Sequence, residues 1–166
     1  MVEYTSRILM RTPAAIEIRR ERTIVVPADV LWQMIEPAEN LAAWLPLCER
    51  CERLSGEGLG RRQRMHARWG RRQGEIDQEV TEYVPGKRLG WRHTAERLDG
   101  KPAPRISSDV SMLIELHSEG AGTRVVLKSR SVPAGVFTRL VLRLIAAPRI
   151  RKAFDQALAI LAGSGD

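Results

Sequence analysis

The C-terminal part of the chain carries a long apolar stripe with helical spacing, and this feature restricts the available folds more than any other. Its members follow one another at intervals of three or four residues: Val136, Leu140, Leu144, Ala147, Ile150, Phe154, Leu158 and Leu161. This spacing predicts one helix over Gly135–Ala162 with a continuous apolar face. Pro148 should disturb it, because proline removes one backbone hydrogen bond and crowds the carbonyl of Leu144. Such a helix needs a long apolar surface to cover it.

The part of the chain before this helix has a different pattern, in which strand-like runs are separated by turn residues. The clearest runs are Gln63–Trp69, Glu75–Val84, Leu89–Thr94, Asp109–Leu116 and Arg124–Val132. Short connections favour antiparallel neighbours. An earlier strand is predicted over Ala14–Val26, followed by short helices that begin at Pro27 and Glu39. The order predicts an α+β fold of the helix-grip type, a curved antiparallel sheet of six or seven strands wrapped around the long C-terminal helix.

One hairpin of this sheet can be placed in register from its charges. The register that matches opposite charges pairs Arg68 with Glu75, His66 with Asp77 and Arg64 with Glu79. It leaves Gly70–Gln73 as the loop. Met65 and Trp69 then share the apolar face with Ile76 and Val80, and a slip by one residue would lose both patterns together.

Composition agrees with a folded protein and limits its partners. The chain has 166 residues, 43% hydrophobic and 28% charged, which predicts one domain over residues 14–163 preceded by an N-terminal arm, residues 1–13. The net charge of +7 favours anionic partners. Because acidic residues lie among the hairpin arginines and few aromatic residues interleave them, we expect no specific nucleic-acid binding. The sequence has no membrane-spanning run and no apolar leader, so the expected location is the cytoplasm.

The segment after the first strand resembles the opening of a known superfamily. It reads Pro27-Ala28-Asp29-Val30-Leu31-Trp32, then Ile35-Glu36-Pro37, Asn40, Trp44 and Pro46. This succession is similar to that of START-like (SRPBCC, helix-grip) proteins, including the polyketide cyclase/dehydrase-like and coenzyme-Q-binding branches, although Glu36 stands where Asp is usual. The order of elements agrees over Ala14–Gly163. The resemblance implies a pocket between sheet and long helix that takes lipids, quinones, hormones or polyketides.

Candidate ligand-binding residues are those expected on the wall of that pocket. They are Met65, Trp69, Gln78, Val80, Trp91, His93, Met112, Ser129, Leu140 and Leu144. Gln78 and Ser129 would supply the few polar groups that such a site needs, although buried water would satisfy them equally well in a plain core. His93 shares a face with Trp91 and is a weak candidate for a catalytic base, because a single inward histidine is more often a hydrogen-bonded core residue.

Cys48 and Cys51 form a C-x-x-C pair. A zinc site needs two more ligands at suitable spacing, and the nearest histidine, His66, belongs to another predicted strand. A redox motif needs its cysteines at a helix start, whereas these begin a strand. We therefore expect no metal site, no cofactor and no functional role for the two thiols.

Three functions from different classes agree with these features. The first is a carrier or sensor that binds a small hydrophobic molecule without chemistry. The second is a cyclase or dehydratase that uses His93 with Gln78 or Glu82, and the third is a protein-interaction module with a filled pocket, in the manner of chaperone-activating relatives. The sequence favours the carrier, because an enzyme needs convergent titratable groups and the predicted inner face carries one histidine.

The first half of the C-terminal helix has a second interpretation. It is apolar over a wide arc between Val136 and Ile145, beside Arg139 and Arg143. That pattern is compatible with transient contact with a membrane surface. Burial under the sheet and the short helices is the commoner reason for it, and the pattern does not specify an oligomeric state.

Overall fold

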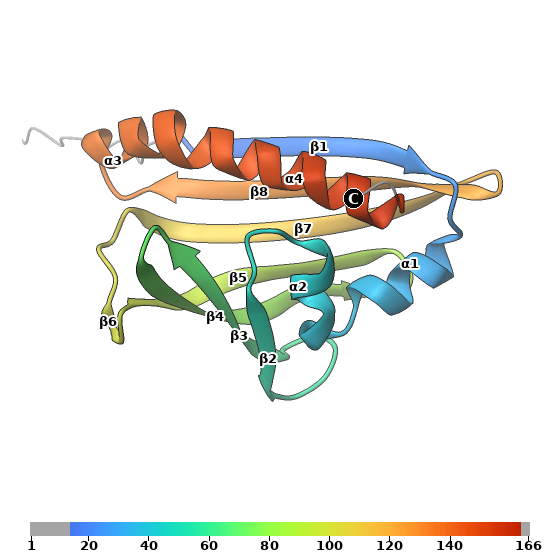
Figure 1. Ribbon diagram of the computed structural model, residues 1–166, viewed down its shortest axis with the longest axis horizontal. Coiled ribbons are helices and arrows are strands. Elements are labelled where there is room, and N and C mark those ends of the chain that lie inside the picture. Colours follow the sequence, from blue (N-terminus) through green and yellow to red (C-terminus); the bar gives the residue numbers. More distant parts are fainter. Residues whose placement is uncertain (1–13, 164–166) are drawn as a thin grey trace, which may run out of the picture.

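The computed structural model describes residues 14–163, which form a curved sheet with helices on its inner side (Figure 1). The strands are β1 Ile16–Ile24, β2 Arg50–Ser55, β3 Arg62–Trp69, β4 Arg72–Val84, β5 Arg88–Leu98, β6 Lys101–Pro102, β7 Ser107–Glu119 and β8 Gly122–Pro133. The helices are α1 Ala28–Ile35, the 3-10 helix η1 Ala38–Asn40, α2 Leu41–Trp44, α3 Val136–Val141, the π-helical turn η2 Leu142–Ala146 and α4 Ala147–Leu161. The predicted N-terminal arm, residues 1–13, lies outside the described residues.

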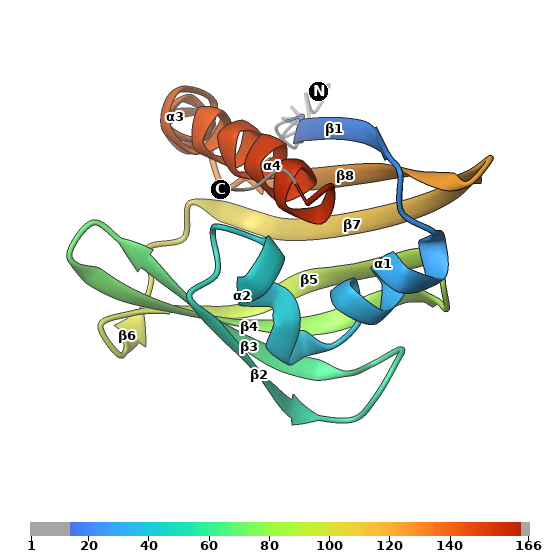
Figure 2. The ribbon, with the colours of Figure 1, turned by 45° about the vertical axis from the view of Figure 1, so that its right-hand side comes forward.

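The sheet confirms the helix-grip prediction. Its strands follow the order β1-β8-β7-β5-β4-β3-β2, with β6 paired to β5, and all pairs are antiparallel. Figure 2 shows the sheet bending around α4 at one end, with α1 and α2 covering the other end of the same face. The two short helices follow the first strand, as predicted. Among the described residues no helix is both long enough and apolar enough to cross a membrane.

Alternating residues of the strands form the core on the inner face. Buried side chains there are Ile18 of β1, Met65 and Ala67 of β3, Ile76 and Val80 of β4, Leu89 and Trp91 of β5, Ile114 and Leu116 of β7, and Val125 and Leu127 of β8. They pack with Leu31 and Trp44 of the short helices and with Phe154 and Leu158 of α4. The period of two residues puts charged side chains on the outer face.

The β3–β4 hairpin corrects the predicted register. Arg64 lies opposite Asp77 rather than Glu79, and the same shift of two residues applies along the whole hairpin. The loop is therefore only Gly70 and Arg71, with Gly70 at a φ of +63°. A shift of two residues keeps every side chain on its predicted face, so the hydrophobic pattern cannot distinguish the two registers. The turn decides, because a two-residue loop matches the twist of the strands.

The C-terminal helix also differs from its prediction. From Ala147 onward the stripe is buried, apart from the half-buried Ile150. Val136, Leu140 and Leu144 are instead 87%, 55% and 67% exposed, so the prediction of a continuous buried face was wrong for this part. The expected disturbance before Pro148 takes the form of the π-helical turn η2, in which the N–H of Ala147 bonds to Leu142 O. One extra residue in a turn rotates the preceding side chains by about 100° relative to α4. The apolar residues of α3 therefore do not continue the stripe of α4.

Candidate ligand-binding site

Several predicted site residues meet in one row across the inner face of the sheet. The strand register places Val80, Trp91, Met112, Ser129 and Ile18 side by side on β4, β5, β7, β8 and β1. Trp91 and Val80 are fully buried, Ser129 is buried and Met112 is half-buried. The row is apolar apart from the hydroxyl of Ser129, and Ile18, Val80 and Trp91 in it belong to the packed core.

Gln78 belongs to a buried polar network that connects the inner face of the sheet to the end of α1. Its side-chain oxygen accepts a 2.9 Å hydrogen bond from Gln63 Nε2. Gln63 Oε1 in turn accepts from Arg61 Nε at 3.2 Å, and Arg61 Nη1 donates to Glu36 Oε1 at 2.8 Å. The hydroxyl of Tyr83 also donates to Glu36, at 3.4 Å, and burial together with the negative charge of Glu36 raises the pKa of Tyr83. The network satisfies groups that would be costly to bury alone.

Sequence reasoning missed two members of this network, Arg61 and Gln63. Both are buried, at 3% and 1% exposure. Gln63 precedes Met65 by two residues on the same strand, so the period of two could have placed it on the inner face. Its partner Gln78 follows only from the true hairpin register. The pair formed by Arg61 and Glu36 joins residues far apart in sequence, and no local pattern announces it.

His93 lies opposite Gln78 in the register and is half-buried. Its Nδ1 is 2.7 Å from Glu96 Oε1, and this hydrogen bond lowers the pKa of Glu96. Glu82, the other predicted partner of His93, lies elsewhere. It borders a groove on the outer face and pairs with Arg88 at 2.8 Å. The structure therefore brings His93 and Gln78 together but separates both from Glu82.

Three of the predicted residues, Trp69, Leu140 and Leu144, are exposed and lie away from the buried inner face of the sheet. Trp69 stands exposed at the tip of the β3–β4 hairpin, where the guanidinium of Arg149 lies 4.7 Å above its ring. Arg149 also donates a 3.0 Å hydrogen bond to the backbone oxygen of Arg68. These contacts join the hairpin tip to α4. Leu140 and Leu144 are exposed on the first half of the helix and line a separate depression.

That depression, which we name the helix groove, runs between the start of β1 and the C-terminal helix and has a volume of about 470 Å³. Its lining residues are Ala15, Ile16, Arg139, Leu140, Arg143, Leu144, Ala147 and Arg151. Ile16 of β1 lies opposite Ser131 of β8, and Ser131 is two residues from Ser129 on that strand. Ile16 therefore faces the same side of the sheet as Ser129. The helix groove therefore continues the inner face of the sheet to its open edge at β1.

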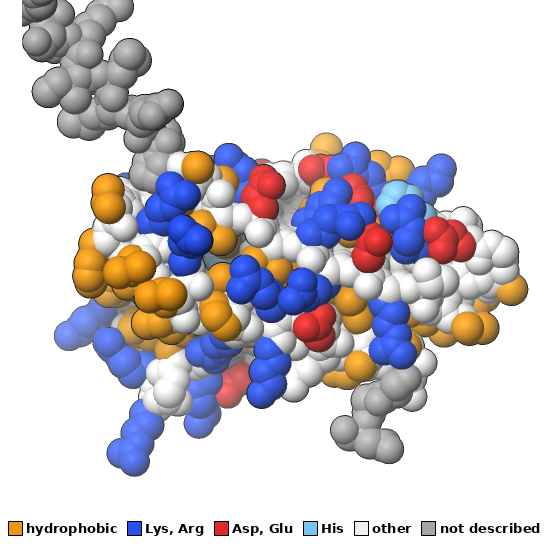
Figure 3. Space-filling model, turned by 90° about the horizontal axis from the view of Figure 1, so that it is seen from above, with side chains coloured by type: hydrophobic (Ala, Val, Ile, Leu, Met, Phe, Trp, Pro, Cys, Tyr) orange, Lys and Arg blue, Asp and Glu red, His pale blue; other side chains and the backbone are white. Residues whose placement is uncertain are grey.

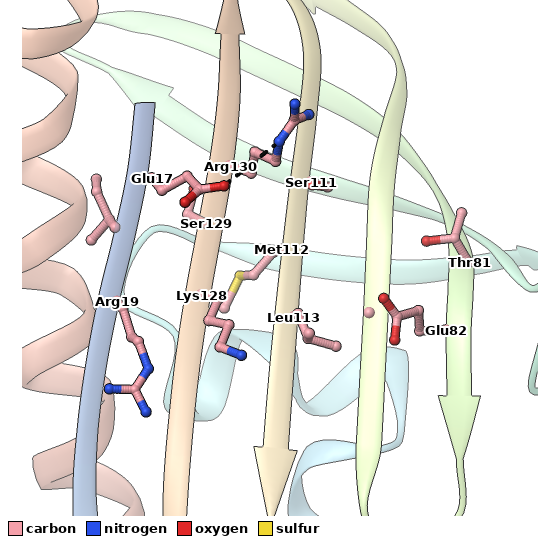
Figure 4. Close-up of a pocket in the computed structure, with 12 residues that line it drawn as sticks. Glu17, Arg19, Thr81, Glu82, Ser111, Met112, Leu113, Lys128, Ser129 and Arg130 are labelled. Carbon is pink, nitrogen blue, oxygen red and sulfur yellow. Dashed lines mark ion pairs between the residues drawn. The ribbon is translucent and has the colours of Figure 1, made fainter. Parts of the chain in front are cut away.

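A second groove, also of about 470 Å³, crosses β1, β8, β7, β5 and β4 (Figure 4). Met112 and Ser129 border it, together with charged side chains such as Lys128. Figure 4 shows Glu17 and Arg130 pointing toward one another, 3.8 Å apart at the nearest atoms. Arg19, Glu82 and Lys128 add further charged side chains to its lining.

The two cysteines are buried and free. Burial is the main reason that the pKa of each thiol, Cys48 and Cys51, is raised to about 12. Thiols with such pKa values are protonated at neutral pH and react poorly. Within residues 14–163 no three His, Cys, Asp or Glu side chains are grouped so that they could hold a metal ion.

Trp44 supplies a feature that the sequence does not reveal. Its side chain is fully buried, and within the described part of the chain its Nε1 is the one buried side-chain N or O atom without a hydrogen-bond partner. A buried donor of this kind is uncommon, because its desolvation is not offset by a bond. An oxygen atom of a small molecule or a water would satisfy it.

Comparison with known proteins gives the same fold. In structure the chain is similar to the TTHA0849 protein of Thermus thermophilus, with a TM-score of 0.70 and 21% identity over 90% of this chain and 96% of that one. It is similar to the Zhui aromatase/cyclase of a Streptomyces species, with a TM-score of 0.69 and 18% identity over 90% and 93%. Ara h 8.0201 aligns with a TM-score of 0.65 and 13% identity over 90% and 97%. At these identities the likeness shows the fold alone.

No curated protein sequence matches the chain. A protein-family profile does, however, and it spans nearly all of the described residues. The matching profile is described as polyketide cyclase / dehydrase and lipid transport, and it covers residues 15–164. The resemblance carried by Pro27–Pro46 and the helix-grip architecture agree with this match. The chain therefore belongs to the polyketide cyclase/dehydrase and lipid transport family, within the START-like superfamily.

Proposed function

We propose that this protein binds a small hydrophobic molecule between the inner face of its sheet and its C-terminal helix, and that it acts as a carrier or sensor. The observation that carries the proposal is the helix groove, whose apolar floor is formed by Ile16, Leu140, Leu144 and Ala147. Its volume of about 470 Å³ falls in the usual range for small-molecule sites. An apolar ligand that covers the exposed leucines of this groove removes apolar surface from water, which favours binding.

The rim of the helix groove indicates the class of ligand. Arg139, Arg143 and Arg151 line it, and within residues 14–163 none of the three takes part in an ion pair. Guanidinium groups bind carboxylates and other anionic oxygen groups in a fixed fork geometry. We therefore infer an amphipathic ligand, with an apolar body on the leucine floor and an acidic or polar oxygen group at the rim, as in a fatty acid.

Native mass spectrometry of the purified protein tests the proposal first, because it would detect a co-purified ligand. Thermal melting with fatty acids, quinones and hydrophobic ring compounds tests it next. A ligand present at about a hundred times its Kd adds about 2.7 kcal/mol of stability, a rise in Tm of about 5–10 °C for a chain of this length. Nucleotides and sugars should cause no shift.

Variants of the helix groove make the test specific. Leu140→Gln combined with Leu144→Gln should abolish the ligand-induced shift, because both side chains line the groove. Both are exposed, so the unliganded Tm should change little. Ile145→Gln is the matched control, since Ile145 is as exposed as Leu144 but does not line the groove. A shift that survives the double variant, or a broad apolar series that causes none, would refute ligand binding at this site and favour the interaction-module alternative.

A second candidate function is a cyclase or dehydratase activity, favoured by the hydrogen bond between His93 and Glu96. A carboxylate that orients a histidine beside Gln78 could support acid–base chemistry on a bound keto compound. The test is incubation with poly-β-keto compounds, followed by mass spectrometry for loss of water. His93→Asn should abolish any such conversion while leaving ligand binding intact. Equal conversion by this variant would exclude His93 as the base.

A further inference from the structure

A group of large apolar side chains stands uncovered on the first half of the C-terminal helix. We name it the apolar helix end, and its members are Val136 at 87% exposure, Phe137 at 77%, Leu140 at 55%, Leu144 at 67% and Ile145 at 67%. Figure 3 shows hydrophobic side chains gathered over the α3 end of the molecule, with Lys and Arg side chains around them. Contiguous exposed apolar surface of this kind marks an interaction site in soluble proteins.

The same segment is strongly basic. From Ala134 to Lys152 the sequence contains Arg139, Arg143, Arg149, Arg151 and Lys152, and it contains no Asp or Glu. The first acidic residue of the helix is Asp155, which Arg20 of β1 approaches to 3.0 Å. The apolar helix end is therefore surrounded by positive charge without local compensation from the helix.

The position of α3 leaves this surface accessible in the described structure. α3 follows β8 directly and lies at the end of the molecule opposite α1 (Figure 1). The π-helical turn η2 separates it from α4, whose buried residues begin at Ala147. The packed part of the helix thus anchors the segment, while its first half presents apolar and basic side chains outward.

We propose that the apolar helix end docks on the surface of an anionic lipid membrane. A helix with apolar side chains and an arginine-rich border binds a membrane surface by inserting the apolar groups among the lipid chains, while the cations contact anionic headgroups. A second copy of this chain fits less well, because a symmetric contact would bring Arg139 and Arg143 toward their own equivalents. A nucleic acid would neutralise the arginines but would leave Val136 and Phe137 uncovered, and so would an acidic protein without an apolar patch of its own. An anionic lipid surface offers both negative charge for the arginines and an apolar interior for Val136 and Phe137.

Sedimentation of the full chain with vesicles tests the proposal. Vesicles of phosphatidylcholine with phosphatidylglycerol should bind the protein at least about tenfold more strongly than vesicles of phosphatidylcholine alone. Binding should weaken as salt is raised, because the headgroup attraction is screened within about 10 Å at 0.1 M salt. Equal binding to both vesicle types, or no binding to either, would overturn the proposal.

Matched variants assign the effect to this surface. Phe137→Ser combined with Ile145→Ser should reduce binding to anionic vesicles by about tenfold or more. Leu59→Ser is the control, because Leu59 is 67% exposed, like Ile145, but lies in the loop before β3. Lys152→Glu should weaken binding, whereas Lys87→Glu, an equal charge change in the turn before β5, should not. Unchanged binding by the Phe137/Ile145 double variant would overturn the proposal.

Two further results would also contradict it. Size-exclusion chromatography that shows a dimer, lost in the Phe137/Ile145 double variant, would assign the surface to self-association. Loss of vesicle binding when residues 1–13 are removed, with full binding by the double variant, would assign it to that segment. Neither Phe137 nor Ile145 lines the helix groove, so ligand-induced melting shifts should persist in the double variant. Failure of the membrane proposal and failure of the ligand proposal are therefore distinguishable.

Discussion

The side-chain nitrogen of Gln63 donates a 2.9 Å hydrogen bond to the side-chain oxygen of Gln78, in a part of the core where each residue is only 1% exposed. Two amides with their polar atoms turned toward one another can lie in an apolar core at little cost. The side-chain oxygen of Gln63, Oε1, accepts a hydrogen bond from Arg61. The guanidinium of Arg61 also donates a hydrogen bond to Glu36, in the segment after α1. The inner face of the sheet is thus joined to the first helix through polar groups as well as through packing.

Gln78→Leu should lower the free energy of unfolding by about 1–3 kcal/mol, because it leaves Gln63 Nε2 buried without its acceptor. The variant should remain folded and should change which ligands raise the Tm. Urea denaturation measures the loss, and Gln73→Leu on the same strand is the control, since Gln73 is exposed. A cost equal to that of the control would show that the amide pair contributes nothing.

Phe154→Ala should cost about 3–5 kcal/mol, the usual range for a buried phenylalanine, since Phe154 is 1% exposed beneath the sheet. Leu144→Ala, ten residues earlier in the same helix, should cost less than about 0.5 kcal/mol, because Leu144 is 67% exposed. Chemical denaturation of both variants measures the difference. A loss below about 1 kcal/mol for Phe154→Ala would mean that α4 is not packed as described.

Asp77 should make the stability of the fold depend on pH in the acidic range. Its carboxylate accepts hydrogen bonds from Arg64 and Arg97, and mainly the bond from Arg64 lowers its pKa to about 2 from the ordinary 3.8. A lowered folded-state pKa gives stability that is present above the unfolded pKa and is lost as pH falls from about 4 to about 2. The contribution is at most about 2 kcal/mol before screening by solvent. Asp77→Asn should therefore flatten the fall in Tm over this range, and an unchanged slope would contradict it.

Cys48 and Cys51 should be unreactive in the folded protein, because burial raises the pKa of both thiols to about 12. A thiol reagent at pH 7 should label neither residue until a denaturant unfolds the chain. The Cys48→Ser/Cys51→Ser variant should retain the fold and its ligand occupancy. Rapid labelling of the native protein, or stoichiometric zinc that the variant loses, would contradict this expectation.

The fold could be predicted because its signals are local. The apolar pattern of strands and helices repeats within a few residues, and Pro27 and Pro37 mark helix boundaries through the chemistry of the proline ring. The hairpin register could not be predicted, because pairings two residues apart, such as Arg64 with Asp77 or with Glu79, satisfy the hydrophobic pattern equally. Only the geometry of the turn separates them.

The candidate site was predicted in part for similar reasons. Gln78, Trp91 and Met112 lie on the inner face because alternation along a strand determines their side. Leu140 and Leu144 could not be placed, because the stripe assumes a regular helix and the turn η2 adds a residue to it. The role of Arg61 could not be predicted, because its partner Glu36 is brought beside it only by the tertiary structure.

The stacking of Arg149 on Trp69 bears on the order in which the molecule assembles. The hydrogen bond beside it, from Arg149 to the backbone of Arg68, spans 81 positions of sequence, whereas the hairpin carrying Trp69 closes over a two-residue turn. A contact between distant positions forms only after the intervening chain has lost much of its conformational entropy. The hairpin should therefore form early in folding, and the hydrogen bond to α4 should form late. The same bond should then be among the first to break during native-state fluctuations, and amide exchange at the hairpin tip should be faster than in the strands behind it.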